Sequence, residues 1–402
     1  MQQTPLKTTH HYMNQDSKTM GSIPDQSIDL IVTSPPYPMI EMWDMLFFSE
    51  NPEIKNHLLK GEAASMFEAM HQCLDPVWKE SFRVLKTGGF LCVNIGDATR
   101  TVNNQFHLFS NHARILTCLI QTGFTVLPAI IWRKQTNAPN KFMGSGMLPA
   151  GAYVTLEHEY ILIVRKGKKR EFKTEREKEN RHESAFFWEE RNLLFSDVWM
   201  DLKGARQRLE NEEGRKRSGA YPFELAYRLI NMYSVKGDLV LDPFMGTGTT
   251  ALAAMAANRN STGFEIDAAL TNIFSSDPQE LLRFLNSIIE DRIGLHLRFV
   301  AQRLQDGKPF KHQNTPYGFP VVTNQEKRLF LNPLQIITRI HPNGFEVYYH
   351  GALLNRYDGP WEGPDKDSEK EPLEERPTKG KGRGRKKKNP GENNGFTQMT
   401  LF

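Results

Sequence analysis

A chain of 402 residues is long enough for one large α/β core and a smaller module. The formal net charge is only +4, which excludes a uniform polycation and directs attention to clusters of basic residues. The sequence begins without a signal-peptide pattern and has no apolar run of membrane-spanning length, so we expect a cytoplasmic protein without contact to a membrane.

The first distinctive segment joins a predicted buried strand, residues 30–32, to the turn Ser34-Pro35-Pro36-Tyr37. A residue before proline avoids the helical region, so Ser34 is expected to leave the strand extended. Because Pro35 and Pro36 lack N–H groups, the turn presents carbonyl acceptors to which an exocyclic amino group can donate. Tyr37 adds a ring on which an extruded base can stack. The alternative is an ordinary loop at the end of a strand.

Alternating helices and strands follow this turn. Helical periodicity predicts helices over residues 62–85 and 105–121. Apolar runs predict strands over residues 90–95, 124–132 and 159–164. This alternation is typical of an α/β fold.

Basic residues are concentrated after the last of these strands. A first cluster lies within residues 165–181, where lysines and arginines are interspersed with glutamates. A second cluster comprises Arg206, Arg208, Arg215, Lys216 and Arg217. Contact with phosphate is one role for such side chains, and a solvated helix face is the other.

A second motif runs from the predicted strand 238–241 through a glycine-containing turn into the predicted helix 251–257. Gly246 and Gly248 permit a tight turn with close approach of a ligand, and the helix amino terminus favours an accepting group. The next strand ends at Glu265, where a carboxylate can accept both ribose hydroxyls of an adenosine ligand. The turn matches neither the dinucleotide fingerprint nor a P-loop, whose lysine is absent.

Together the two motifs resemble the amino-group DNA methyltransferases that use S-adenosyl-L-methionine, in the permuted order with the catalytic tetrapeptide before the cofactor loop. The resemblance implies a Rossmann-like mixed seven-stranded sheet, with double-stranded DNA as substrate and no metal. It assigns the catalytic role to Ser34, Pro35, Pro36 and Tyr37. It assigns cofactor binding to Asp16, Tyr221, Pro222, Asp242, Pro243, Phe244, Gly246, Gly248, Thr249, Thr250 and Glu265.

The resemblance also bears on the target base. Family members with serine at the position of Ser34 usually modify N4 of cytosine, which we therefore expect here, with N6 of adenine as the alternative. Methylation at C5 of cytosine needs a thiolate, but Cys73, Cys92 and Cys118 lie in apolar patterns and are expected to be reduced core residues. An alternative of another class is a noncatalytic DNA or clamp adaptor that kept the fold.

The resemblance divides the chain into segments. Residues 1–270 form the predicted catalytic domain, with the target-recognition region at 165–217 and a DNA-contacting loop, or a plain hairpin connection, at 133–146. Residues 271–355, with a predicted helix over 277–304 and a hairpin over 334–349, form an accessory α+β module for DNA binding or dimerisation, or a structural appendage.

The last segments have a different composition. Residues 360–397 are rich in Pro, Gly, Glu and Lys, which predicts a disordered basic linker. Residues 398–402 resemble the peptide by which replication proteins bind DNA sliding clamps, with Gln398, Leu401 and Phe402 at the contacting positions. The expected partners are therefore DNA, a sliding clamp and, in a restriction-modification system, a cognate restriction endonuclease.

Overall fold

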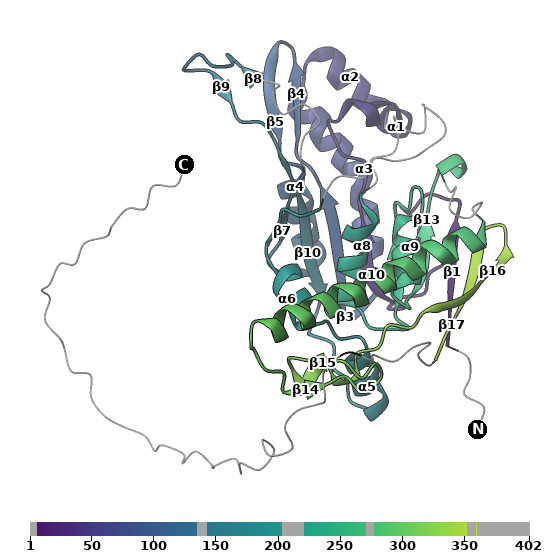
Figure 1. The fold of residues 1–402 in the computed structure, drawn as a ribbon. Helices are drawn as coiled ribbons and strands as arrows, with labels where there is room; N and C mark the ends of the chain where they lie inside the picture. Colours follow the sequence, from purple (N-terminus) through teal and green to yellow (C-terminus); the bar gives the residue numbers. More distant parts are fainter. Residues whose placement is uncertain (1–5, 135–142, 203–220, 271–276, 352–358, 360–402) are drawn as a thin grey trace, which may run out of the picture. The chain divides into compact units, whose positions relative to one another are not determined.

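The structure is a computed structural model that describes residues 6–134, 143–202, 221–270, 277–351 and 359 (Figure 1). All of these residues belong to one compact unit, Met1–Gly363. The predicted linker 360–397 and the clamp-like peptide 398–402 lie outside the described residues, and so does the second basic cluster.

The core of the molecule is a mixed sheet of eleven strands in the order β11-β7-β10-β3-β2-β12-β13-β1-β17-β16, with β6 also pairing with β10. Its strands are β1 (Lys7–Met13), β2 (Ile28–Thr33), β3 (Leu85–Ile95), β6 (Phe124–Val126), β7 (Ile130–Arg133), β10 (His158–Lys166), β11 (Val198–Trp199), β12 (Leu239–Asp242), β13 (Asn260–Phe264), β16 (Leu334–His341) and β17 (Gly344–Tyr349). The five strands β3, β2, β12, β13 and β1 are parallel to one another, and β10 runs antiparallel to β3. The predicted mixed sheet is confirmed and is larger than seven strands, because further strands extend both edges.

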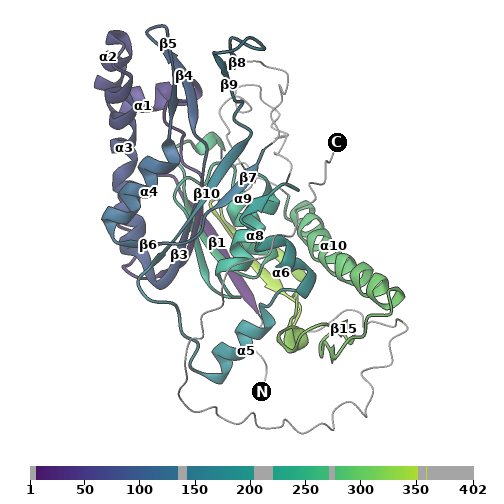
Figure 2. The same ribbon diagram turned by 90° about the vertical axis from the view of Figure 1, so that its left-hand side faces the viewer.

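Helices cover both faces of this sheet (Figure 2). The helical elements are η1 (Glu41–Trp43), α1 (Asp44–Glu50), α2 (Glu53–Lys60), α3 (Ala63–Val84), α4 (Asn111–Thr122), α5 (Glu175–Glu183), α6 (Trp188–Leu194), α8 (Phe223–Tyr233), α9 (Thr249–Ala256), η2 (Ala268–Leu270), α10 (Pro278–Gln305) and η4 (Asn324–Arg328). Short hairpins are formed by β4 (Ala98–Val102) with β5 (Gln105–Phe109), β8 (Met143–Gly144) with β9 (Ala152–Tyr153) and β14 (His312–Gln313) with β15 (Pro320–Val321).

Alternate residues of the central strands join two separate hydrophobic clusters, as the two-residue period of a strand requires. Leu30 and Cys92 belong to the cluster with α8, α9 and α10. Ile31 and Leu91 belong to the cluster with α3 and α4. Cys92 and Cys118 are buried, as predicted for core residues, whereas Cys73 is half-buried and lines the cavity described below; all three are free thiols.

Two predicted elements differ from the structure. The predicted helix 105–121 is wrong in its first part, because Asn103 and Asn104 adopt φ of 49° and 58° and close the turn between β4 and β5. Only α4, from Asn111, is helical there. The predicted strand 124–132 is divided into β6 and β7, and the interruption contains Pro128, which cannot donate to a ladder.

The predicted helix 277–304 and the predicted hairpin 334–349 are both observed, as α10 and as β16 with β17. The hairpin pairs with β1 through β17, so it extends the main sheet. Strand β1 itself was not predicted. Within the described residues, the segment assigned to an accessory module is therefore continuous with the catalytic sheet.

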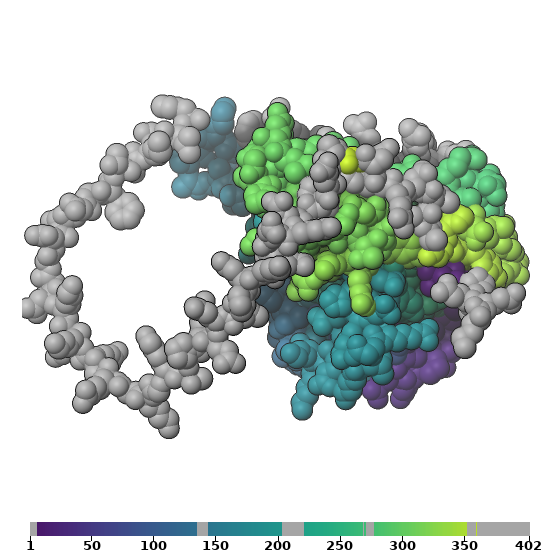
Figure 3. Space-filling view, turned by 60° about the horizontal axis from the view of Figure 1, so that its bottom comes forward, coloured from purple at the N-terminus to yellow at the C-terminus, as the bar shows by residue number. Residues whose placement is uncertain are grey.

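The segment of the first basic cluster lies at the end of the sheet where β12 begins. Asn180 of α5 donates to the Lys236 carbonyl at 2.8 Å, and Phe330 donates its N–H to the Glu183 carbonyl at 3.2 Å. In Figure 3, which brings this end forward, the teal residues of this segment adjoin the yellow-green residues of the C-terminal segment. Helix α5 thus lies at the opposite end of the sheet from the last residue of β12, Asp242.

Candidate active site

The segments that follow β2 and β12 open into one cavity of about 640 Å³. These two parallel strands are neighbours, so their carboxyl ends lie at the same edge of the sheet. The cavity is lined by the predicted residues Asp16, Ser34, Pro35, Pro36, Tyr37, Tyr221, Asp242, Pro243, Phe244, Gly246, Thr249 and Glu265. Three predicted residues, Pro222, Gly248 and Thr250, are outside this lining. The tetrapeptide and the glycine turn, which are over 200 residues apart in the sequence, therefore share one cavity.

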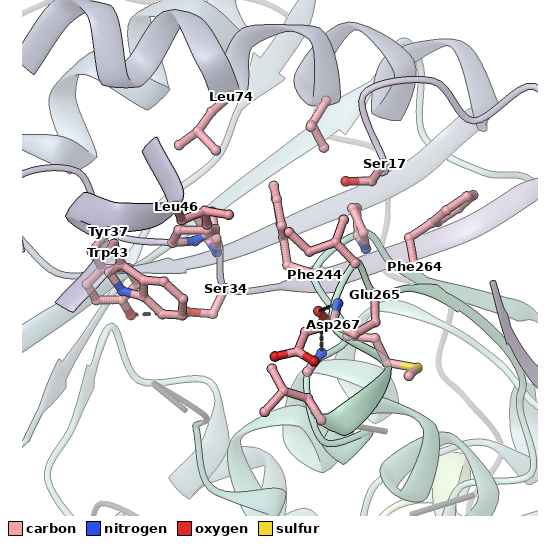
Figure 4. A pocket seen from close by; sticks show the side chains of 18 of the residues that line it. Ser17, Ser34, Tyr37, Trp43, Leu46, Leu74, Phe244, Phe264, Glu265 and Asp267 are labelled. Atoms are coloured by element: carbon pink, nitrogen blue, oxygen red, sulfur yellow. Dashed lines mark hydrogen bonds between the residues drawn. The ribbon is translucent and has the colours of Figure 1, made fainter. Parts of the chain in front are cut away.

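The cavity has two ends, which we call the serine end, at Ser34 to Tyr37, and the glycine end, at Gly246 and Glu265. Figure 4 shows on one side Ser34, Tyr37, Trp43 and Leu46, and on the other Phe264, Glu265 and Asp267, with Phe244 between them. Trp43 and Leu46 come from η1 and α1, elements to which the sequence assigned no role.

Asp242 ties the two ends together. Its Oδ1 accepts hydrogen bonds from Thr33 Oγ1 at 2.7 Å and from the Phe244 N–H at 3.1 Å. Its Oδ2 accepts from the hydroxyls of Tyr221 and Thr250. Burial raises the pKa of this carboxyl, and the hydrogen bonds from the surrounding donors partly offset that rise. Asp242, Tyr221 and Thr250, all predicted to contact the cofactor, are thus bound to one another in the described structure.

The glycine end owes its shape to the backbone. Gly246 has φ of 53° and Gly248, the N-cap of α9, has φ of 89°, a region that side chains other than glycine rarely adopt. A Cβ at Gly246 meets no atom within 4 Å, so its conformation, and not lack of space, calls for glycine there.

Glu265 faces the same end of the cavity. Its Oε2 accepts the Gly246 N–H at 2.8 Å and its Oε1 accepts the Asp267 N–H at 2.8 Å. Burial raises the pKa of this carboxyl. Both oxygens retain accepting capacity, because a carboxylate oxygen has two lone pairs. The arrangement fits a ligand with two neighbouring hydroxyls.

The walls next to Glu265 fit the adenine part of such a ligand. Phe244 and Phe264 supply apolar surface, and the Phe244 ring lies edge to face with Trp78 at 6.2 Å between centroids. The Asp16 side chain is half exposed and accepts the Lys18 N–H at 2.8 Å. Its second oxygen, Oδ2, lies 3.7 Å from Lys18 Nζ, and the carboxylate is part of the cavity lining.

The serine end is built from side chains of distant segments. Ser34 Oγ donates to Tyr37 Oη at 3.1 Å, and Tyr37 Oη donates to Glu159 Oε2 at 2.9 Å. Asn94 Nδ2 donates to Tyr37 Oη at 2.8 Å and to Glu159 Oε2 at 2.7 Å. Lys134 Nζ donates to Glu159 Oε1 at 2.8 Å. Burial, and then the charge of Glu159, raises the pKa of Tyr37 well above its usual value, so its hydroxyl keeps its proton.

The sequence reasoning missed Glu159 and Asn94. Each is a polar residue beside the apolar run of its strand, Asn94 at the end of the run in β3 and Glu159 near the start of β10, and their exposures are 2% and 8%. A polar side chain in a buried strand requires hydrogen-bond partners, and this signal in the sequence pointed to a polar site.

The predicted DNA-contacting loop is described only in part. Lys134, its second residue, lines the cavity, whereas residues 135–142 lie outside the described residues. Among the described residues, no group of three or more His, Cys, Asp or Glu side chains has the geometry of a metal site. None of the helices in the described ranges combines the length and hydropathy needed to cross a membrane.

The family model for DNA methylase, N6_N4_Mtase, matches residues 28–275. The type II methyltransferase M.MthZI of Methanothermobacter thermautotrophicus is 50% identical over 345 residues, which cover 86% of this chain and 96% of the relative. The type II methyltransferase M.MjaI of Methanocaldococcus jannaschii is 44% identical over 312 residues, covering 75% of this chain and 96% of the relative.

Solved structures give the same assignment. TTHA0409 of Thermus thermophilus, described as a DNA modification methylase and solved with S-adenosyl-L-methionine, has a TM-score of 0.52 and 30% identity. The match covers 68% of this chain and 93% of that one. With the cavity at the carboxyl ends of β2 and β12, these similarities lead to one conclusion: the chain belongs to the N6/N4 DNA methylase family.

Proposed function

We propose that this DNA methyltransferase transfers a methyl group to N4 of a cytosine in duplex DNA. The observation that carries the proposal is the shared cavity, which brings the Ser34-Pro35-Pro36-Tyr37 turn and the glycine turn to one space. Serine as the first residue of the tetrapeptide favours cytosine, by resemblance to family members with that residue. Methylation at C5 needs a thiolate, and burial raises the pKa of Cys73, the one cysteine in the lining, to about 11.

The methyl donor is S-adenosyl-L-methionine, which supplies an electrophilic methyl group when bound. The glycine end fits its nucleoside. Glu265 is positioned to accept the ribose hydroxyls, Asp16 to accept from the adenine amino group, and Phe244 to contact the adenine face.

The residues of the serine end position the target amine. Ser34 Oγ and the Pro35 carbonyl are acceptors for its two hydrogens, and they orient the nitrogen lone pair toward the methyl donor. The Tyr37 ring supplies a stacking surface for the base. Trp43 and Leu46 line this end of the cavity, and we expect their apolar surfaces to exclude water from the bound base.

A base can reach this cavity only outside the duplex, so the proposal includes base extrusion. Two hairpins, β4–β5 and β8–β9, stand at the same end of the molecule as α1 (Figure 1). They contact each other through Phe106 and Tyr153, whose rings are stacked at 4.9 Å. Met147 and Leu148, between β8 and β9, are 84% and 71% exposed. We expect these apolar side chains to contact the base stack that the target leaves.

Product analysis tests the proposal directly. The full chain is incubated with duplex DNA and S-adenosyl-L-methionine, the DNA is digested to nucleosides, and the products are identified by mass spectrometry. N4-methylcytosine is expected. N6-methyladenine would favour the alternative target, and absence of any methylated nucleoside would favour a noncatalytic DNA or clamp adaptor.

The type II methyltransferases among the relatives support the proposal of a restriction-modification system with a cognate endonuclease. Single-molecule sequencing of DNA from a host that expresses the protein identifies the modified sequence. Cleavage of unmodified but not modified DNA at that sequence, by an endonuclease of the same source, is the expected result. We keep the target-recognition proposal for the second basic cluster, residues 206–217, since α5 lies at the opposite end of the sheet.

The proposed clamp contact rests on the sequence of residues 398–402 alone. Deletion of these five residues is expected to abolish pull-down of a DNA sliding clamp and to leave methylation of short oligonucleotides intact. Clamp binding by the truncated chain would reject this part of the proposal.

A further inference from the structure

We propose that Glu159 is a positioning residue for methyl transfer: it sets the direction of the hydrogen bonds at the serine end, so that Ser34 presents only lone pairs to the target amine. The inference rests on the proposed function of Ser34 as acceptor of the amine hydrogens. It adds a role for a residue that neither touches the cofactor end nor belongs to the tetrapeptide.

The donor inventory gives the direction. Glu159 is a carboxylate and can only accept, so Tyr37 uses its single hydroxyl proton to donate to Glu159 Oε2 at 2.9 Å. Tyr37 Oη is then an acceptor for Ser34, whose only hydroxyl proton is donated to it at 3.1 Å. Ser34 Oγ therefore has no proton to offer the cavity, and its lone pairs remain for an N–H donor.

Two donors hold Glu159 in the accepting role. Lys134 Nζ donates to Oε1 at 2.8 Å and Asn94 Nδ2 donates to Oε2 at 2.7 Å. Glu159 is 8% exposed, and the ammonium supplies the opposite charge that a buried carboxylate needs. Glu159 also orients the Asn94 amide, because the Asn94 amide oxygen would be repelled by the carboxylate and the Asn94 amide nitrogen donates to it.

Gly96 leaves the space in which this arrangement forms. A Cβ at Gly96 would lie 3.1 Å from the Tyr37 ring and 3.3 Å from Glu159 Cγ. The ring and the carboxylate therefore meet over a position that has no side chain. A side chain at residue 96 would press on both the Tyr37 ring and Glu159, so glycine after β3 suits the contact between them.

Replacement of the carboxylate by an amide of the same shape separates direction from size. In Glu159→Gln, either the amide nitrogen faces Lys134, or it faces Tyr37 and reverses the chain so that Ser34 donates into the cavity. Both arrangements bring two donors together. We expect kcat to fall by roughly 100-fold, the size found for other transition-state hydrogen bonds, with unchanged affinity for S-adenosyl-L-methionine.

A double variant tests whether the direction of the hydrogen bonds, and not the charge of Glu159, sets the rate. In Glu159→Gln with Lys134→Met, the amide nitrogen can turn toward the place of the lost ammonium, which leaves the amide oxygen to accept from Tyr37. We expect kcat at saturating DNA to recover by about tenfold over Glu159→Gln alone, since one hydrogen bond of about 1.4 kcal/mol corresponds to that factor. Glu157→Gln is the matched control, because Glu157 also pairs with a cation, Arg133 at 3.3 Å, and is outside the cavity lining.

The assay is steady-state methylation of duplex DNA with the full chain, with cofactor binding measured separately by calorimetry. Loss of kcat in Glu159→Gln, recovery in the double variant and unchanged kcat in Glu157→Gln support the inference. Wild-type kcat in Glu159→Gln, or no recovery in the double variant, would overturn it. Absence of methylated product from the wild-type chain would overturn the proposed function of the site instead.

Discussion

The two ends of the cavity are built in different ways. The glycine end takes its shape from one continuous stretch, in which β12, the turn at Gly246 and β13 follow each other within 27 residues, Leu239 to Glu265. The serine end combines the turn after β2 with side chains from β3, β10 and the residue after β7. Backbone conformation therefore determines the first end, and side-chain hydrogen bonds between strands determine the second.

Because the two ends are built differently, we expect substitutions at each end to affect different measured quantities. Substitution at the glycine end is expected to change how strongly the cofactor binds. Substitution at the serine end is expected to change the rate of transfer and leave cofactor affinity unchanged. Substitution of Asp242, which is hydrogen-bonded to residues at both ends, is expected to lower the stability of the whole catalytic unit.

The largest effect is expected for Asp242→Ala. The substitution removes the acceptor of the Thr33 hydroxyl and of the Phe244 N–H, and it leaves the Tyr221 and Thr250 hydroxyls with only each other as partners. We expect a loss of about 4 kcal/mol in the free energy of unfolding, since each unsatisfied buried group costs roughly 1–3 kcal/mol.

Urea unfolding of this variant, followed by circular dichroism, measures the loss as a lower midpoint with an unchanged slope. Asp291→Ala, which removes an exposed carboxylate on α10, is the control and is expected to leave the unfolding free energy within about 0.5 kcal/mol of the wild type. A stable Asp242→Ala protein would show that the two ends do not depend on this tie.

Ser34→Ala tests the serine end alone. Loss of the accepting hydroxyl is expected to reduce kcat by about 100-fold, because the amine loses an interaction made in the transition state. The affinity for S-adenosyl-L-methionine, measured by calorimetry, is expected to stay the same. Ser287→Ala, on the outer face of α10, is the control. Weaker cofactor binding in Ser34→Ala would contradict the separation of the two ends.

Glu265→Gln tests the glycine end alone. An amide at this position accepts at one atom only, and its nitrogen opposes either the Gly246 N–H or the Asp267 N–H. We expect the dissociation constant of S-adenosyl-L-methionine to rise about 30-fold, equivalent to about 2 kcal/mol. The kcat at saturating cofactor is expected to remain near the wild-type value, and a large fall in kcat with unchanged affinity would refute the assignment.

The smallest effect concerns two buried histidines, one behind each end. His71 bonds Asn111 Oδ1 at 3.0 Å, and Asn111 Nδ2 in turn donates to the Pro38 and Gly96 carbonyls of the serine end. His10 bonds Ser261 Oγ at 2.8 Å on β13, the strand that leads to Glu265.

Burial lowers the pKa of His71 from 6.5 to about 4 and that of His10 from 6.5 to about 3. The unfolded chain therefore binds more protons than the folded chain below pH 6.5, and the stability present above that pH is lost as the pH falls toward 4 and 3. The expected slope is about 1.4 kcal/mol per pH unit for each histidine. His71→Gln is expected to reduce the slope of unfolding free energy between pH 6 and 5, in urea titrations at each pH, by about 1.4 kcal/mol per pH unit, the contribution of this one histidine.

Sequence reasoning located the two turns that line the cavity and missed part of the side-chain support behind them. Ser34, Tyr37, Gly246 and Glu265 were found because their sequence neighbours mark the turns. An apolar run precedes each turn, and prolines or glycines lie within it. Asn94 and Glu159 were missed, because each adjoins a run of apolar residues and its hydrogen-bond partners lie tens of residues away in the sequence.

The same reason explains the fold. The apolar periodicity predicted an α/β fold with α3, α10 and the final hairpin, and the family resemblance implied the mixed sheet. The helix over 105–121 was wrong at its start, because a turn at two asparagines and its cross-strand pairing outweighed helical periodicity. The attachment of β17 to β1 depends on pairing between residues over 330 apart, which periodicity does not encode.

The sequence by itself determined the type of protein, the two turns and the residues within them, because proline and glycine restrict the backbone locally. Only the tertiary structure decided that the turns share a cavity and that Glu159 stands behind Tyr37. The physical reason is that hydrogen-bond direction depends on which donors and acceptors meet in space, and strand order, not sequence separation, brings them together.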